Sequence, residues 1–295
     1  MSIKTSDNLH SELNIGDALP GPENTSDSPH LFVSLSDLAS EHIFYHPCYK
    51  TVKSTLDDVE RNSIEAILGS ASAEDHFVAT LTEQVLQAIQ PNHQSIRVAL
   101  SSADSYELGS LLGGKVESTE INPALGLRGV SRYASEPFNS VFALECKVIK
   151  TLQQQGVQVD IVIPFVRALS DAAKIIDLLA EQGLPRGLNG LKVLYTVDVP
   201  SAALMSERLL HYFDGVVINL ENLAQFTLGV DRLNEELEYL FDPQSEAVID
   251  LIDKSVRAAN SSSKPIVMIS SGLARYHRIQ DYMVEHSNIE LVVTL

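Results

Sequence analysis

Short apolar runs recur along the chain, and stretches with the three- and four-residue spacing of amphipathic helices separate them. Most of the runs are nearly continuous in Val, Ile and Leu, as in strands that are buried on both faces of a sheet. The pattern predicts eight strands, at residues 31–39 (passing into a helix), 96–102, 122–133, 158–166, 191–199, 215–219, 265–271 and 289–295.

The predicted helices between these strands include residues 56–68, 74–90, 137–155 and 170–182. Eight strands separated by helices favour an α/β fold of the (β/α)8 TIM-barrel type over a doubly wound sheet. We expect a single barrel over residues 31–295 that ends on its eighth strand without the usual closing helix. Residues 1–30 are rich in Ser, Asp, Asn, Pro and Gly and are expected to form a flexible N-terminal arm.

Acidic and amide side chains follow two neighbouring predicted strands. Asp198 comes at the end of the run at 191–199, and Glu221 and Asn222 follow the run at 215–219. The carboxyl ends of adjacent parallel strands lie side by side, so these three residues are predicted to meet. Their oxygens suit a hard cation such as Mg²⁺. The open alternative is that Asp198 hydrogen-bonds a loop and Glu221 is solvated.

Composition and charge narrow the class of protein. The 295 residues are 44% hydrophobic, carry a formal net charge of −18 and include only two cysteines. No stripe of Lys and Arg is present to neutralise a phosphate backbone, so a nucleic-acid partner is not expected. The sequence has no signal-peptide pattern and no apolar run of about 18 residues, so we expect a cytoplasmic protein with no membrane partner.

Several ordered motifs then point to a known family. They are LLGG at 111–114, NPALGLRGVSRY at 122–133, FALEC at 142–146, IPFVR at 163–167, RGLNGLKV at 186–193, DVPS at 198–201, FDG at 213–215 and LGVDR at 228–232. With these motifs the chain resembles the C-terminal phosphoenolpyruvate/pyruvate-binding barrel of the phosphoenolpyruvate synthase family. The resemblance implies a barrel that holds pyruvate on Mg²⁺ and exchanges a phosphoryl group with a phosphohistidine on a separate domain.

The residues that touch substrate in that family are mostly changed here. The resemblance implies two arginines on the phosphoryl group; Arg128 keeps one, whereas Ala99 stands in place of the other. Arg97 lies two residues earlier, about one pleat deeper along the strand, and is a poor substitute. An Arg and a Glu of the family's first strand correspond to Ser34 and Ser36.

The metal and proton-transfer positions have changed as well. The family's Glu ligand corresponds to Asp198, and its Gly-Ser-Asn-Asp turn to the residues at 219–222. The family's cysteine after the seventh strand corresponds to Ile269, which cannot transfer a proton, or to Ser270 with a one-residue shift. The nucleotide-binding and phosphohistidine domains have no counterpart in the sequence, and we expect no synthase cycle in this chain alone.

Two arginines are candidate anion ligands. Arg128 and Arg132 both lie in the motif at 122–133 and could bind a small anionic keto acid or phosphoenolpyruvate. The alternative is that they pair with acids such as Glu107 or Glu145 and hold loops together.

Three functions remain open. The favoured one is a catalytically inactive relative of the synthase barrel, a pseudoenzyme that binds or regulates, as a homodimer or with a synthase-like partner. The second is a repurposed Mg²⁺-dependent lyase or aldolase acting on pyruvate, phosphoenolpyruvate or a related keto acid through Asp198 and Glu221. The third is a subunit that supplies the barrel to separately encoded domains.

Overall fold

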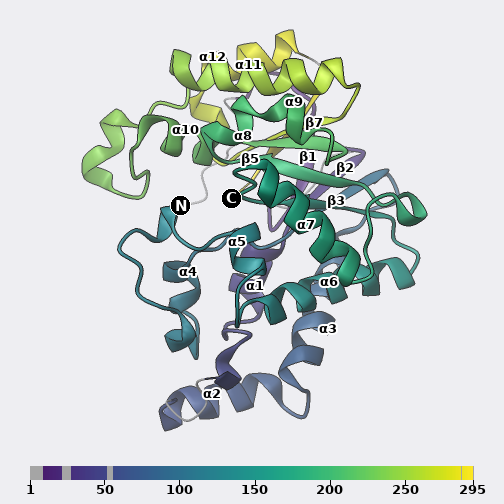
Figure 1. The fold of residues 1–295 in the computed structure, drawn as a ribbon, viewed down its shortest axis with the longest axis vertical. Helices are drawn as coiled ribbons and strands as arrows, with labels where there is room; N and C mark the ends of the chain where they lie inside the picture. The colour runs from purple at the N-terminus through teal and green to yellow at the C-terminus, as the bar shows by residue number, and fades with distance from the viewer. Residues whose placement is uncertain (1–8, 22–27, 52–55, 287, 295) are drawn as a thin grey trace.

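The computed structural model describes residues 9–21, 28–51, 56–286 and 288–294. Its centre is a closed barrel of eight parallel strands in the order β1 to β8 (Figure 1). The strands are β1 Ile15–Leu19, β2 His30–Ser34, β3 Ser95–Ala99, β4 Val159–Ile163, β5 Val193–Val197, β6 Gly215–Asn219, β7 Ile266–Ser270 and β8 Ile289–Val293. This confirms the predicted (β/α)8 barrel. Thr294, the last described residue, directly follows β8.

Helices connect the strands and surround the barrel (Figure 1). The α-helices are α1 Leu35–His42, α2 Asp58–Leu68, α3 Ala73–Ala88, α4 Ser105–Gly109, α5 Val130–Tyr133, α6 Asn139–Gln154, α7 Leu169–Glu181, α8 Pro200–Leu204, α9 Ser206–Leu209, α10 Leu220–Leu228, α11 Glu246–Ser261 and α12 His277–Glu285. Short 3-10 helices are η3 Gly114–Val116, η4 Pro123–Leu125, η5 Leu188–Gly190, η6 Glu235–Leu240 and η7 Leu273–Arg275. None of the helices in the described ranges has the length and apolarity that a membrane span requires.

One barrel strand lies where the sequence predicted an arm. β1 falls inside residues 1–30 and closes the barrel, with Asp17 opposite Leu31 of β2 and Ile15 opposite Leu291 of β8. Asp17 is buried and accepts a hydrogen bond from His93 Nε2 at 2.9 Å. The expectation of an arm up to residue 30 is therefore wrong for β1, while residues 1–8 and 22–27 lie outside the described residues.

The segment at 122–133 does not form the predicted strand. It contains η4 and α5, joined by a loop through Gly126 and Gly129. Gly129 has φ +54°, and a Cβ there would lie 2.7 Å from Cβ of Phe165 and closer still to the Pro164 carbonyl oxygen. Glycine adopts this positive φ readily, and the turn that it makes at Gly129 brings the loop against the end of β4 in place of an extended strand. With β1 in the sheet, the barrel still has eight strands.

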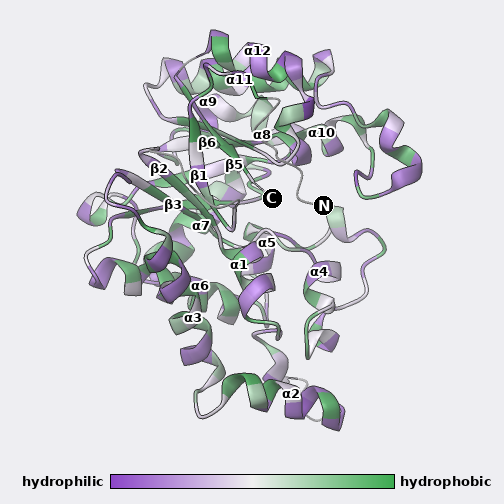
Figure 2. Ribbon diagram, turned by 180° about the vertical axis from the view of Figure 1, so that it is seen from behind, coloured by the Kyte–Doolittle hydropathy of each residue, from purple (hydrophilic) through white to green (hydrophobic). Residues whose placement is uncertain are grey.

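The core has two parts. Inside the barrel, side chains from the strands form one apolar cluster of Ala18, Phe32, Ala99, Val162, Leu194, Val217, Val267, Ile269 and Val292. The larger cluster packs the outer faces of the strands against the helices. Figure 2 shows apolar residues concentrated on the strands and hydrophilic residues more frequent on the surrounding helices. The barrel interior is therefore filled, and a ligand must bind at one of its ends.

Candidate functional site

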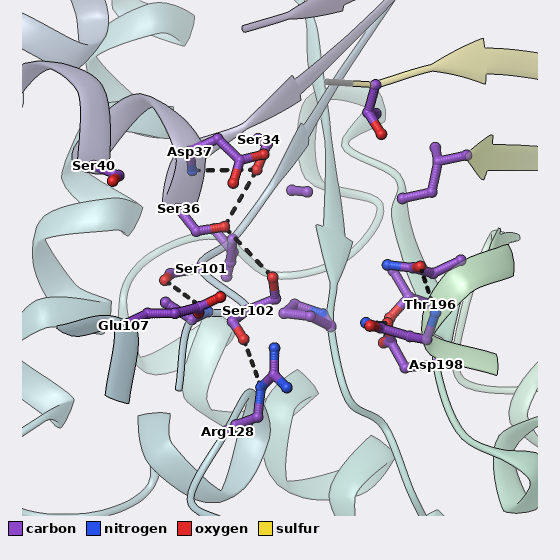
Figure 3. Close-up of a pocket in the computed structure, with 18 of the residues that line it drawn as sticks. Ser34, Ser36, Asp37, Ser40, Ser101, Ser102, Glu107, Arg128, Thr196 and Asp198 are labelled. Atoms are coloured by element: carbon purple, nitrogen blue, oxygen red, sulfur yellow. Dashed lines mark hydrogen bonds between the residues drawn. The ribbon is translucent and has the colours of Figure 1, made fainter. Parts of the chain in front are cut away.

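A cavity of about 290 Å³ lies at the carboxyl ends of the strands (Figure 3). The interior side chains Phe32, Ala99 and Ile269 line it from the apolar cluster inside the barrel. Its polar lining residues come from strand ends, from the loops that follow them and from the helices α1, α4 and α10. They are Ser34, Ser36, Asp37, Ser40, Ser101, Ser102, Glu107, Arg128, Thr196, Asp198, Asn219, Glu221, Asn222, Arg232, Ser271 and Thr294. Asp198, Glu221 and Asn222 thus line one cavity, at the end of the barrel where sites of this fold are found.

Asp198 is almost fully buried, with 1% of its surface exposed, and its carboxylate accepts three hydrogen bonds. Oδ2 accepts from the Phe165 backbone N–H at 2.9 Å and from the Thr196 hydroxyl. Oδ1 accepts from the amide nitrogen of Asn222 at 2.8 Å. The alternative in which Asp198 bonds a loop therefore describes this carboxylate.

The bond from Phe165 gives Asp198 a structural role. Phe165 has φ +53°, a left-handed conformation that is uncommon for a bulky residue and raises its energy by about 1–3 kcal/mol. Its ring lies under Arg128, with the guanidinium carbon 4.2 Å from the ring centroid. Asp198 stabilises the backbone turn at Phe165, and the turn places the ring that supports Arg128.

Glu221 is buried as well, with 5% of its surface exposed. It lies in the first turn of α10, which Asn219 caps by accepting a hydrogen bond from the Asn222 N–H at 3.2 Å. Glu221 Oε1 accepts from the Ser270 hydroxyl at 2.7 Å and from the backbone N–H groups of Ser271 and Gly272, both at 3.0 Å. The alternative in which Glu221 is solvated is wrong, because this carboxylate holds the end of β7.

The three residues do not fit a preformed magnesium site. Asn222 directs its amide nitrogen, a donor, to Asp198, whereas Mg²⁺ requires oxygen lone pairs in an octahedral arrangement. Donors from the protein also occupy both oxygens of Asp198 and Oε1 of Glu221. Within the described ranges, no group of three or more His, Cys, Asp and Glu side chains is arranged to hold a metal ion.

Arg128 reaches the cavity from the loop before α5. Its Nε donates to the Ser102 carbonyl oxygen at 2.8 Å, and its Nη1 lies 3.8 Å from Oδ2 of Asp104. Arg167 fastens the same loop to the end of β4 by donating to the carbonyl oxygens of Arg128, at 3.2 Å, and Gly126, at 3.3 Å. Arg128 is therefore a well-supported cation in the wall of the cavity (Figure 3).

Arg132 lies elsewhere. It donates to both carboxylate oxygens of Glu117, stacks over the Phe138 ring at 3.7 Å, and is not among the residues that line the cavity. His46 Nε2 lies 2.7 Å from the same carboxylate. Burial alone would raise the pKa of Glu117, but hydrogen bonds and charge from His46 and Arg132 lower it. The alternative of loop pairing therefore describes Arg132, although the partner is neither Glu107 nor Glu145.

Serine hydroxyls form a row along the wall between β2 and the end of β3. Ser34 Oγ lies 3.2 Å from Ser36 Oγ, which in turn lies 3.4 Å from Ser102 Oγ (Figure 3). Ser34 and Ser36 stand at positions where the resemblance implies charged residues. The sequence analysis did not identify Ser102, Thr196 or Phe165 as site residues. Thr196 could have been found, because it lies two residues before Asp198, and side chains two residues apart in a strand point to the same face.

Apolar side chains on the barrel strands form part of the lining. Ile269 lines the cavity, whereas the Ser270 hydroxyl is buried and donates to Glu221. Ala99 also lines it, while Arg97 lies deeper in the barrel and binds both oxygens of Glu290. The described lining contains no cysteine and no histidine, so neither a thiol nor an imidazole is available there for proton transfer.

Comparison with known proteins agrees with this architecture. The phosphoenolpyruvate synthase of Pseudomonas aeruginosa (strain UCBPP-PA14) is 36% identical over 234 residues, which cover 77% of this chain and 29% of that protein. That of Escherichia coli (strain K12) is 36% identical over 227 residues, covering 75% and 28%. Malate synthase of Haloferax volcanii, solved as a lead(II) complex, superimposes with a TM-score of 0.50 at 12% identity, over 92% of this chain and 63% of that one. This last likeness shows the fold alone.

The chain spans less than a third of the length of these synthases. Residues 50–284 match the family described as "PEP-utilising enzyme, PEP-binding domain". That match covers most of the barrel, from β3 to β7 with the helices between them. The chain therefore belongs to the family of PEP-utilising enzymes, as a member of its PEP-binding domain.

Proposed function

We propose that this barrel binds a small ligand at its mouth without catalysing phosphoryl transfer, and that it serves as a binding or regulatory protein. The observation that carries the proposal is the state of the two carboxylates in the cavity. Asp198 and Oε1 of Glu221 accept six hydrogen bonds from the protein, three each. They act as anchors for the strand ends, and this role accounts for their presence without a metal.

The proton-transfer and phosphoryl-binding groups support the same proposal. Formation of phosphoenolpyruvate from pyruvate needs an acid or base at the methylene carbon and cations on the transferred group. Ile269 and Ala99 offer neither, although they line the cavity at the corresponding positions. Arg128 is the one family cation that remains in the wall, and the exposed Arg232 is the only other cation in the described lining.

The test is a turnover assay of the purified chain with phosphoenolpyruvate or pyruvate, ATP and Mg²⁺, next to the phosphoenolpyruvate synthase of E. coli as the positive control. We expect no conversion above the level of a heat-treated sample. Turnover at ordinary enzyme rates, lost in Asp198→Asn, would overturn the proposal. Sedimentation velocity, alone and with a synthase, tests the accompanying proposal that the barrel acts as a homodimer or with a synthase-like partner.

One observation favours a second candidate, a repurposed Mg²⁺-dependent lyase or aldolase for keto acids in the cytoplasm. Asp198 and Glu221 line the same cavity, and Oε2 of Glu221 accepts no hydrogen bond from the described residues. This candidate requires a divalent cation at the corner. Calorimetric titration with MgCl₂ separates the two: the first proposal expects no heat of binding, and the second expects binding that Asp198→Ala abolishes.

A further inference from the structure

Among the buried charged residues of the lining, the internal hydrogen bonds leave two groups with capacity for a ligand; Asp37, Glu107 and Arg232 are exposed. The first is the outer edge of the Arg128 guanidinium. Its Nε donates to Ser102, and its Nη1 has only the long ion pair with Asp104. Its Nη2 has no hydrogen-bond partner among the described residues. The second is Oε2 of Glu221, because all three donors to this carboxylate reach Oε1. One group carries positive charge and the other negative charge.

These groups belong to different walls. Arg128 lies on one side of the cavity with Ser34, Ser36 and Ser102, and the acids Asp37 and Glu107 are on the same side (Figure 3). Asp198 lies with Thr196 on the other side (Figure 3). Asn222 links Asp198 to the first turn of α10, which carries Glu221, so Glu221 belongs to the acidic wall. The apolar side chains of Phe32, Ala99 and Ile269 line the cavity as well. A ligand that spans the cavity meets the Arg128 guanidinium and serine hydroxyls at one end, with two exposed carboxylates beside them. It meets the carboxylate of Glu221 at the other end and an apolar patch between.

The charge balance of the cavity argues against a ligand with several negative charges. Four carboxylates line it, those of Asp37, Glu107, Asp198 and Glu221, against the two guanidinium groups of Arg128 and Arg232. Bringing a phosphate ester next to this excess of negative charge is unfavourable without a metal, and the corner does not present a preformed metal site. A ligand with its own positive group faces no such penalty.

We propose that the cavity binds a small zwitterion, an amino acid, with its carboxylate on Arg128 and its ammonium group on Oε2 of Glu221. The ligand's carboxylate would also accept hydrogen bonds from the row of serine hydroxyls, and a short side chain would rest on Ile269. The inference rests on the proposed function, since it names the ligand of the same site. The volume of about 290 Å³ is large enough to admit a molecule of this size.

The experiment is isothermal titration calorimetry of the full chain with glycine, alanine, β-alanine and 4-aminobutyrate, a series that varies the separation of the two charges. Lactate and ethylamine are the matched ligands that lack one charge each. We expect at least one amino acid to bind, and lactate and ethylamine to bind at least tenfold more weakly. Failure of every amino acid to bind would overturn the inference, as would equal binding of lactate.

Variants locate the binding site. Glu221→Gln keeps an oxygen for the three internal donors while it replaces the free oxygen by an amide, so the fold is retained and affinity should fall at least tenfold. Arg128→Gln should weaken binding similarly, and Arg128→Lys should recover part of it. Glu207→Gln, an exposed acid of α9 outside the cavity, is the control and should change nothing. Binding that is unaffected by Glu221→Gln and Arg128→Gln would refute this site.

The outcome separates this inference from the proposed function. Phosphoenolpyruvate that binds through Arg128 without turnover, while no amino acid binds, would refute the zwitterion and leave the proposed function standing. Turnover of phosphoenolpyruvate would refute the proposed function whichever ligand binds.

Discussion

Exchanging the side chains of Asp198 and Asn222 tests whether the corner is held by internal hydrogen bonds. In Asp198→Asn, the new amide turns its oxygen to Phe165 and Thr196, so its nitrogen faces the amide nitrogen of Asn222. The Asn222 amide can turn over, so that its oxygen accepts from the new amide nitrogen. The three bonds to a charged acceptor then become neutral ones, which should lower the free energy of unfolding by about 2 kcal/mol.

The reverse change fails for a different reason. Asn222→Asp places a second carboxylate against Asp198, where the present bond is 2.8 Å long. Like charges at this separation in a buried setting should destabilise the fold by roughly 3 kcal/mol. In the double variant, the donor and the acceptor of this bond exchange places. The amide nitrogen at position 198 then faces a carboxylate oxygen at position 222, while the amide oxygen at position 198 still accepts from Phe165 and Thr196.

The measurement is urea unfolding of the four proteins at pH 8 with EDTA, analysed as a double-mutant cycle. We expect the exchange to recover most of the loss, which corresponds to a coupling free energy of about 3 kcal/mol between Asp198 and Asn222. Losses that simply add would refute the assigned hydrogen bond and the structural role of this corner. Thr196→Val, which removes one of three donors, is a milder comparison, at about 1 kcal/mol.

Three other changes test neighbouring features. In Asn222→Asp, which supplies a second oxygen ligand, added MgCl₂ should raise the melting temperature, while the parent should show no such shift in differential scanning fluorimetry. Burial raises the pKa of Glu145 to about 7, so the folded state retains a proton that the unfolded chain releases above about pH 4.5. As the pH rises from about 4.5 to 8, the free energy of unfolding should therefore fall by roughly 3 kcal/mol more in the parent than in Glu145→Gln. An equal fall in both proteins would contradict the raised pKa of Glu145. Gly129→Ala places a Cβ 2.7 Å from Cβ of Phe165 at a residue with φ +54°. The free energy of unfolding, measured in urea, should fall by about 2 kcal/mol or more, and Arg128 should be displaced. An unchanged midpoint of unfolding would contradict the close packing.

Much of the barrel was predictable because buried parallel strands leave long apolar runs in the sequence. β1 was not, since its five residues include Gly16 and the buried acid Asp17. That acid is satisfied by His93, which lies 76 positions further along the chain and outside any local pattern. The segment at 122–133 was predicted as a strand and is not one. Its apolar residues resemble a short strand, but the glycines between them permit a tight loop.

The site was predictable in its location and less so in its chemistry. Parallel strands bring Asp198 and Glu221 to one cavity, as their positions after consecutive strands implied. Which groups satisfy them depends on backbone N–H groups at Phe165 and at the end of β7, and backbone donors carry no sequence signature. The separation of Arg128 from Arg132 likewise depends on Glu117, which lies in the loop after η3.

Hydrogen bonds from the protein stabilise the buried carboxylates of Asp198 and Glu221, and this affects which ligands the cavity can bind. A buried carboxylate needs either a cation or several hydrogen-bond donors. A bound Mg²⁺ would cancel the two negative charges of Asp198 and Glu221, whereas the neutral donors found here stabilise the charges and leave them in place. The mouth of the barrel then keeps its negative charge opposite Arg128. If no metal binds, the electrostatic demand on the ligand differs from that of a metal site: an anion held on a cation is disfavoured, and the proposed molecule with its own positive group is favoured.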